Sequence, residues 1–180
     1  MKRSDSSNET ERSKDRPGYR YLYSHQPSAH LSDTLILDTL LSQIKDTIYF
    51  KDADSRFILN NRTHIMQFGR KDQNELIGVR DADLYPKEFA DICRQDELQV
   101  METGIPVIDR VEQAVDSKGE VITFSTCKYP LYDHNGKIVG TWGISHDITK
   151  LVKAEEEVAQ VNAKLMALSL VDDLSGLYNR

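Results

Sequence analysis

Apolar side chains near the start of the chain recur at spacings typical of one face of a helix. Ser32 or Asp33 stands where an N-cap residue is favoured. Residues 31–45 are therefore predicted to form a short N-terminal amphipathic helix. The preceding residues 1–30 are rich in charged and small polar side chains without apolar periodicity, so we expect a disordered tail there.

Beyond this helix the apolar pattern changes to the alternation typical of β-strands. Five β-prone segments are predicted: Thr47–Lys51, Arg56–Asn60, Ile108–Val115, Val121–Leu131 and Lys137–Ser145. Clusters of Asp, Asn, Ser and Gly separate the first two strands and the last three, as in hairpin turns. Neighbouring strands within each group should therefore pair antiparallel.

Helical segments are predicted between the second and third strands. Two short ones, Thr63–Phe68 and Gln73–Ile77, each end at a glycine. A longer one opens at Pro86, a residue favoured at the first helical position, and closes before Gly104. This order predicts the α+β fold class: a five-stranded antiparallel sheet with helices on one face and a ligand cavity between them.

Residues 150–171 contain neither Gly nor Pro and are predicted to form one continuous helix. Its apolar residues repeat every seven positions, with a second one three after each, as in a two-stranded coiled coil. The predicted dimer seam consists of Leu151, Ala154, Val158, Val161, Leu165 and Leu168. Lys150 would lie opposite the partner's Glu155, which favours a parallel homodimer. The alternative is a monomeric helix that folds back on its own domain.

Composition and charge narrow the classes of partner. The net charge of -6 and the isoelectric point near 5.4 disfavour nucleic acid and anionic membranes. No apolar run approaches the roughly 20 residues that span a bilayer, so a cytoplasmic location is expected. The two cysteines, Cys93 and Cys127, form no CxxC and have no close histidine, so neither a disulfide nor a metal site is predicted.

Three stretches within residues 46–149 resemble PAS domains, namely DTIYFKDADSRFILNN, LIGVRDADLYP and YPLYDHNGKIVGTWGISHDIT. The last is the most specific, because it combines Pro130, the Asp133–Gly136 turn and the final Asp147-Ile148-Thr149. The resemblance implies a PAS fold with a sensory role. It also implies that Asp147 and Thr149 couple the sheet to the following helix, with simple capping by Thr149 as the alternative.

The closing residues 172–180, DDLSGLYNR, resemble the opening of GGDEF diguanylate cyclase domains, with Ser in place of the usual Thr. The motif residues are Asp172, Leu174, Ser175, Gly176, Asn179 and Arg180. The resemblance implies a C-terminal cyclase domain in cis that converts GTP to cyclic-di-GMP with Mg²⁺. The nucleotide loop and metal-binding carboxylates of that family are not among these residues, so no activity is expected of this chain itself.

Together these resemblances imply a bacterial signal-transduction module in which a homodimeric PAS sensor controls a diguanylate cyclase through dimer geometry. The alternative is a PAS domain that acts only as a constitutive dimerisation or protein-interaction scaffold without a small ligand. A phosphodiesterase domain after the cyclase is compatible with both.

Eight residues are candidates for contact with a small-molecule ligand, although each also fits an ordinary core role. They are Phe50, Phe57, Phe89, Cys93, Asp96, Met101, Phe124 and Trp142. The carboxylate of Asp96, within an apolar stripe, needs a partner either in nearby backbone or in a ligand.

The identity of such a ligand stays open, but two cofactors are disfavoured. Haem is disfavoured because the predicted long helix carries no histidine, and His64 is interpreted as an ordinary surface or packed residue. A photoactive flavin is disfavoured because Asn-Arg-Thr-His stands at residues 61–64, where flavin-binding PAS domains carry Asn-Cys-Arg.

Overall fold

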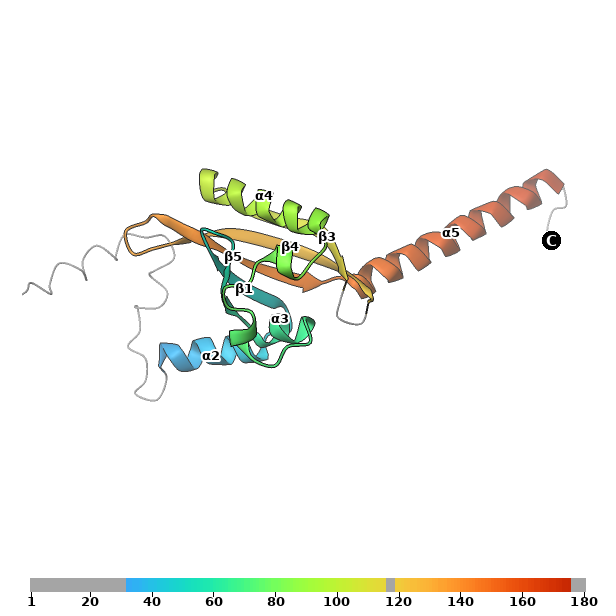
Figure 1. Ribbon diagram of the computed structural model, residues 1–180. Helices are drawn as coiled ribbons and strands as arrows, with labels where there is room; N and C mark the ends of the chain where they lie inside the picture. Colours follow the sequence, from blue (N-terminus) through green and yellow to red (C-terminus); the bar gives the residue numbers. More distant parts are fainter. Residues whose placement is uncertain (1–31, 116–118, 176–180) are drawn as a thin grey trace, which may run out of the picture.

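The computed structural model describes residues 32–115 and 119–175, with side chains as far as residue 167. Five strands form one antiparallel sheet in the order β2-β1-β5-β4-β3 (Figure 1). Their bounds are β1 (Thr47–Asp52), β2 (Phe57–Asn60), β3 (Val107–Val115), β4 (Val121–Tyr132) and β5 (Ile138–Asp147). The predicted α+β class with a five-stranded antiparallel sheet is confirmed.

The helices lie before, between and after the two groups of strands. Their bounds are α2 (Asp33–Gln43), α3 (Arg62–Gln67), η1 (Gln73–Glu75), η2 (Asp81–Asp83), α4 (Lys87–Thr103) and α5 (Thr149–Ser175). The long helix α4 lies across one face of the sheet (Figure 1). It ends at Gly104, whose φ of 68° is the left-handed conformation that glycine adopts without strain.

Strand alternation separates two faces of the sheet. In β1 the buried residues Thr47, Tyr49 and Lys51 face the helices, so Ile48 and Phe50 face the other way. Lysine and threonine thus occupy the inner positions of a strand that also carries apolar residues on its outer positions. The sequence alone therefore does not show which face of β1 turns toward the helices.

The N-terminal helix α2 forms as predicted, with the side chain of Ser32 accepting a hydrogen bond from the N–H of Leu35 at 3.1 Å. It contacts α3, but none of its residues is buried, and Leu35 and Leu40 are each 48% exposed. The described elements therefore leave most of its apolar surface uncovered.

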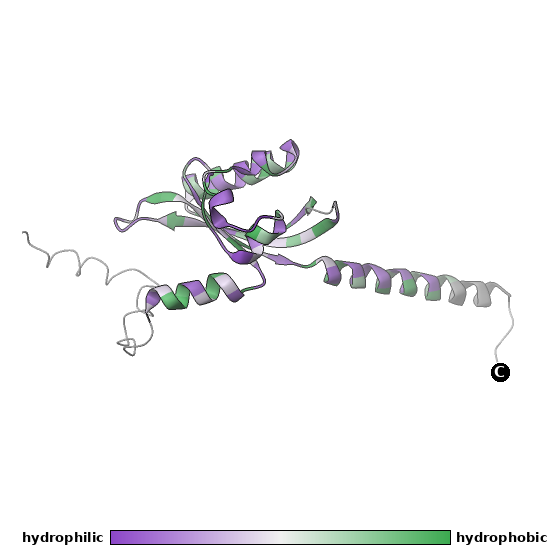
Figure 2. Cartoon of the chain, turned by 60° about the horizontal axis from the view of Figure 1, so that its bottom comes forward, coloured by the Kyte–Doolittle hydropathy of each residue, from purple (hydrophilic) through white to green (hydrophobic). Residues whose placement is uncertain are grey.

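The C-terminal helix α5 extends away from the sheet and carries alternating apolar and polar bands (Figure 2). The described part of α5 does not fold back onto its own domain, so the alternative of a folded-back helix is wrong for this structure. The helix continues to Ser175, four residues beyond the predicted end at 171.

Several predictions lie outside the described residues. They concern the tail at residues 1–30, the end of the GGDEF-like motif at residues 176–180, and the side chains of the seam and motif from Leu168 onward. Among the described helices, none is both long and apolar enough to cross a membrane.

Apart from the C-terminal end of α5, element boundaries differ from the predictions by up to two residues, and one predicted short helix differs in kind. The predicted helix Gln73–Ile77 is the single 3-10 turn η1, which begins with an Asp72–Glu75 capping box. The turn η2 was not predicted, because its Asp81-Ala82-Asp83 sequence carries no apolar periodicity.

Candidate functional site

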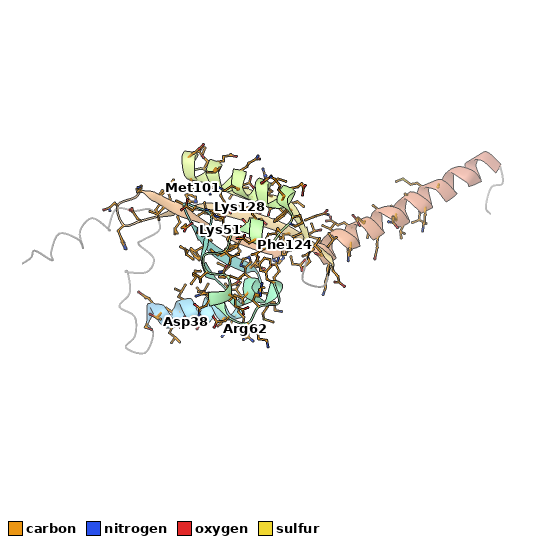
Figure 3. All side chains as sticks on the ribbon, viewed as in Figure 1. Asp38, Lys51, Arg62, Met101, Phe124 and Lys128 are labelled. Atoms are coloured by element: carbon orange, nitrogen blue, oxygen red, sulfur yellow. The ribbon has the colours of Figure 1, made fainter. Side chains whose placement is uncertain are left out.

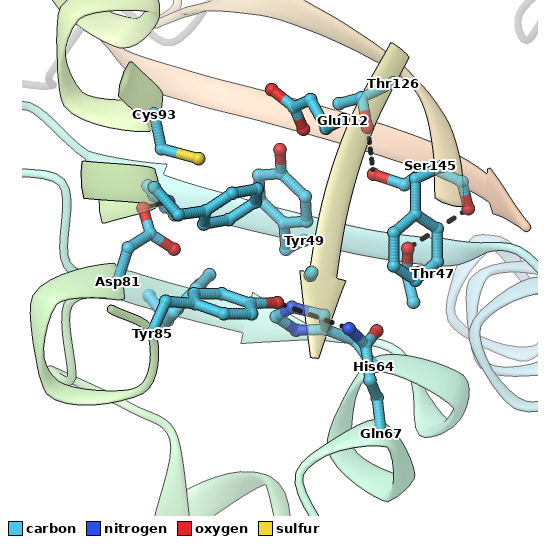
Figure 4. Close-up of a pocket in the computed structure, with 15 residues that line it drawn as sticks. Thr47, Tyr49, His64, Gln67, Asp81, Tyr85, Cys93, Glu112, Thr126 and Ser145 are labelled. Atoms are coloured by element: carbon cyan, nitrogen blue, oxygen red, sulfur yellow. Dashed lines mark hydrogen bonds and ion pairs between the residues drawn. The ribbon is translucent and has the colours of Figure 1, made fainter. Parts of the chain in front are cut away.

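A small cavity lies between the inner face of the sheet and the helices (Figure 4). Its volume is about 30 Å³, which is room for about two water molecules. The lining residues come from all five strands, α3, α4 and the η2 region. They are Thr47, Tyr49, Lys51, Phe57, His64, Gln67, Asp81, Tyr85, Phe89, Cys93, Glu112, Ala114, Phe124, Thr126 and Ser145.

The ring of Tyr49 forms much of the cavity floor because β5 carries Gly143 directly opposite it. A Cβ on Gly143 would lie 2.4 Å from the Tyr49 hydroxyl and ring. The absence of a side chain at this position lets the ring lie across β5. Tyr49 also makes an edge contact with Phe57, with ring centroids 5.9 Å apart.

Lys51 forms a buried ion-pair cluster at one end of the cavity. Its Nζ binds the carboxylates of Asp81 from η2 and of Glu97 from α4, the latter at 2.5 Å. The Lys51 side chain is 2% exposed, and the two carboxylates raise the lysine pKa against the opposing effect of burial. Lys51 therefore keeps its positive charge, and its ion pairs link β1 to η2 and α4.

The second carboxylate of this cluster, Glu97, has additional support. Its other oxygen accepts a hydrogen bond from the hydroxyl of Ser55, which lies 2.5 Å from the guanidinium of Arg94. Burial nevertheless raises the pKa of Glu97 above its usual value.

Lys128, which is labelled in Figure 3, forms a second ion-pair cluster from β4. Its Nζ binds Asp96 at 3.0 Å and Glu112 at 2.8 Å, and Asp96 also binds the guanidinium of Arg110 at 2.9 Å. Adjacent carboxylates of α4, Asp96 and Glu97, thus bind lysines from two different strands. Both clusters hold α4 against the sheet.

His64 is buried within a group of aromatic rings rather than on the surface. Its Nδ1 lies 2.8 Å from Oδ1 of Asn60, and its ring centroid lies 5.1 Å from that of Phe57 and 5.3 Å from that of Tyr49. Burial and the nearby Lys51 charge lower the pKa of His64 to about 3, so the ring is neutral. The structure thus decides between the two roles considered for His64 in favour of packing, and places it in the cavity wall.

The predicted ligand candidates divide into two groups. Phe57, Phe89, Cys93 and Phe124 line the cavity. Asp96 does not, because its carboxylate is bound by Lys128 and Arg110, which are side chains rather than the expected backbone or ligand. Met101 lies in the last turn of α4, outside the cavity lining (Figure 3).

Phe50 and Trp142 correct the prediction, because they face away from the cavity. They are directly paired across β1 and β5, and their rings stack with centroids 6.0 Å apart. Tyr129 of β4 stacks on the other side of Trp142 at 4.6 Å. Their parity in the strands is opposite to that of the lining residues Tyr49 and Ser145, which places this stack on the outer face.

Sequence reasoning missed the charged cavity residues Lys51, Asp81 and Glu112, and also the buried Lys128 that pairs with Glu112. A usable signal was present in β4, where Phe124, Thr126 and Lys128 alternate on one face. A lysine at a core position requires a buried carboxylate partner.

Asp147 and Thr149, the predicted coupling residues, both form hydrogen bonds at the junction between the sheet and α5. Thr149 does not simply cap the helix with its own side chain. The Asp147 carboxylate accepts a hydrogen bond from the Thr149 N–H at 2.9 Å. The Thr149 hydroxyl instead accepts one from the N–H of Thr123 in β4, also at 2.9 Å. Thr123 precedes the cavity residue Phe124 in β4. The first residue of α5 is therefore hydrogen-bonded to a residue adjacent to the cavity lining.

The two cysteines are expected to react very differently. Burial raises the pKa of the Cys93 thiol to about 12, which leaves about one thiolate in ten thousand at pH 8. Cys127 is only half-buried. We expect a chromogenic disulfide reagent at pH 8 to label Cys127 first and Cys93 only after unfolding. Fast labelling of native Cys127→Ser protein would contradict the enclosed position of Cys93.

An antiparallel sheet that encloses a small polar cavity beneath helices, and passes directly into an outgoing helix, defines a sensory domain of the PAS type. The chain belongs to this family: the profile described as PAS fold matches residues 41–153.

Curated relatives are signalling proteins. The chain is 30% identical over 141 residues to the methanogenesis regulatory histidine kinase FilI of Methanothrix harundinacea, covering 78% of this chain and 16% of that protein. It is 27% identical over 145 residues to a diguanylate cyclase of Vibrio cholerae serotype O1, covering 79% of this chain and 42% of that protein. The chain therefore spans less than half of either relative.

Solved structures similar to this chain include two of VqmA. VqmA bound to DPO has a TM-score of 0.58 and 26% identity, over 63% of this chain and 57% of that one. The Vibrio cholerae VqmA dimer without target DNA has a TM-score of 0.60 and 27% identity, over 68% of this chain and 53% of that one. The chain is thus a PAS sensory domain of the kind found in signal-transduction proteins.

Proposed function

We propose that this PAS domain binds a small molecule in its inner cavity and thereby sets the geometry of a homodimer that controls a C-terminal diguanylate cyclase, in the cytoplasm. One observation carries the proposal most directly. The PAS sheet leads through α5 into the cyclase-like motif at residues 172–180, and a diguanylate cyclase matches 79% of the chain.

The exposed apolar stripe of α5 supports the dimer. Leu151, Val158, Val161 and Leu165 are each between 55% and 60% exposed in the isolated chain. Such a stripe at heptad spacing is stabilised when a second copy covers it. Dimerisation suits the chemistry, because joining two GTP molecules symmetrically requires two loaded sites to face each other.

The cavity supports the sensory part of the proposal. It is partly polar and lies close to the Thr123–Thr149 hydrogen bond at the start of α5. A ligand that shifts Phe124 would therefore act on the strand that anchors the helix. The VqmA structure bound to DPO offers a precedent, at 26% identity, for a small molecule in a protein of similar fold.

A constitutive dimerisation scaffold is the second candidate, and the small cavity favours it. A volume of about 30 Å³ holds about two waters without rearrangement. Under this alternative the dimer would form and act without any bound molecule.

Charge placed in the predicted seam is expected to break the dimer. Val158→Lys puts two ammonium groups against each other and should weaken dimerisation about a hundredfold or more, because each buried charge lacks a partner. Gln160→Lys, at an exposed outward position, should leave it nearly unchanged. Native mass spectrometry of the full chain measures oligomeric state and retained small molecules together.

The same two variants test control of the cyclase. We would place this chain in a chimera, in exchange for the matching segment of the Vibrio cholerae diguanylate cyclase. Val158→Lys should lower production of cyclic-di-GMP and Gln160→Lys should not. Equal activity of both variants, or a wild-type chain that stays monomeric, would contradict control through the α5 seam.

A further inference from the structure

The charges around the cavity already neutralise one another. Four carboxylates, Asp81, Asp96, Glu97 and Glu112, are matched by Lys51, Lys128, Arg94 and Arg110 through direct ion pairs or through Ser55. A charged ligand would find no unmatched counter-charge here. It would have to separate one of the buried pairs and leave a carboxylate or ammonium without a partner, which is strongly unfavourable.

The neutral polar groups are in the opposite situation, because some of their hydrogen-bonding capacity is unused. Within the described residues, no hydrogen bond reaches the hydroxyl of Tyr49, although this residue is only 8% exposed and lines the cavity. Burial and nearby carboxylates raise the pKa of Tyr49 well above its usual value, so the hydroxyl keeps its proton as a donor. The hydroxyl faces the cavity, so its acceptor must be water or a ligand bound there.

His64 supplies the complementary group. Its Nδ1 lies 2.8 Å from Asn60 Oδ1, and with the Asn60 amide in this orientation the neutral ring donates its Nδ1–H and keeps Nε2 as a lone-pair acceptor. Because the ring is neutral at ordinary pH, this acceptor is not lost to protonation. Aromatic side chains around both groups, including Phe57, Tyr85 and Phe89, favour a flat molecule.

We infer that the cavity recognises a small, planar, uncharged molecule whose polar edge accepts a hydrogen bond from Tyr49 and donates one to His64. The inference rests on the proposed sensory function and specifies the chemical class of its ligand. An amide or lactam-like edge has both required groups next to each other.

Entry of a ring-sized molecule requires the half-buried side of the cavity to move. Gln67 donates a hydrogen bond to the Tyr85 hydroxyl at 3.3 Å, and this bond links α3 to the segment before α4. Tyr85 contacts Phe89 with ring centroids 4.7 Å apart, and all three residues are only partly buried. Displacement of this group would enlarge the cavity without breaking either buried ion-pair cluster.

Four probes of similar size test the class of ligand on the full chain. Benzamide is neutral with a donor and an acceptor, benzoate is anionic, benzylamine is cationic at pH 7, and toluene has no polar edge. Isothermal titration should show benzamide binding about tenfold or more tightly than each of the other three. Tyr49→Phe should weaken benzamide binding about fivefold to tenfold, as loss of one hydrogen bond does. Tyr132→Phe is the control, because Tyr132 is 48% exposed and outside the cavity.

Tighter binding of benzoate or benzylamine, no effect of Tyr49→Phe, or no binding of benzamide would each overturn the inference. Native mass spectrometry separates this failure from failure of the sensory function. A charged molecule retained by the purified chain would overturn the ligand class and leave the sensory function standing. A chain that retains nothing and binds no probe would count against both.

Discussion

Lys51→Met protein is expected to lose about 3–5 kcal/mol of unfolding free energy, which is the usual cost of removing one partner from a buried ion pair. The substitution leaves the carboxylates of Asp81 and Glu97 facing each other in a site where the lysine side chain was 2% exposed. Methionine fills similar volume, so the loss comes from charge rather than from a cavity. Urea unfolding followed by the fluorescence of Trp142 measures it.

Lys87→Met is the matched control for this prediction. Lys87 pairs with Asp91 at 2.5 Å, but the two side chains are 80% and 56% exposed. An exposed pair of this kind contributes little to stability, because solvent screens it. If both variants unfold at the same urea concentration, the Lys51 cluster does not stabilise the fold in the way that its burial implies.

Gly140→Ala is expected to destabilise the protein by at least about 3 kcal/mol, at the upper end of what overpacking costs. A Cβ at this position would lie 2.0 Å from the carbonyl oxygen of Lys51 and 3.0 Å from the Cα of Asp52. Both contacts are with the backbone of β1, which pairs with β5 at this point, so neither can move aside as a side chain could. The central strand pair would have to separate.

Gly78→Ala distinguishes this steric effect from backbone strain. Gly78 has a φ of +79°, but nothing lies within 4 Å of an added Cβ. Its cost should be limited to the roughly 1–2 kcal/mol of a left-handed conformation. Equal thermal stability of Gly140→Ala and wild type would show that β1 and β5 approach less closely than described.

Under the proposed ligand class, the two lysine clusters would set the selectivity of the cavity as well as stabilise its walls. Each ties α4 to a different strand, and Lys51 and Glu112 also line the cavity. Hydrophobic residues could hold α4 in place at less desolvation cost. Unlike hydrophobic residues, the ion pairs make the cavity wall polar, and each charge in them has a partner of opposite sign.

The order of strands and helices could be predicted from the sequence because each depends on local periodicity and turn chemistry. The alternation in Val121–Tyr132 and the Asp133–Gly136 turn, for example, are properties of neighbouring residues. Four of the cavity residues, Phe57, Phe89, Cys93 and Phe124, followed from the same patterns, since buried apolar positions are visible without knowing their partners.

Which face of each strand turns inward was decided only by the tertiary structure. In β1 the inward set is Thr47, Tyr49 and Lys51, while Phe50 stacks outside with Trp142. Local hydrophobicity favours the opposite choice. The inward choice is stabilised by carboxylates from η2 and α4, residues 30 and 46 positions further along the chain.

Which polar groups around the cavity pair with each other likewise cannot be predicted from neighbouring residues in the sequence. Lys128 meets Glu112 because β3 pairs with β4, although the register places Glu112 opposite Phe124, and it meets Asp96 because of the rotation of α4 about its own axis. The ring of Tyr49 can lie against β5 because Gly143, on that different strand, has no side chain. The sequence by itself determined the elements and their order, whereas strand register and helix orientation determined which polar groups meet, because those contacts join residues far apart in the chain.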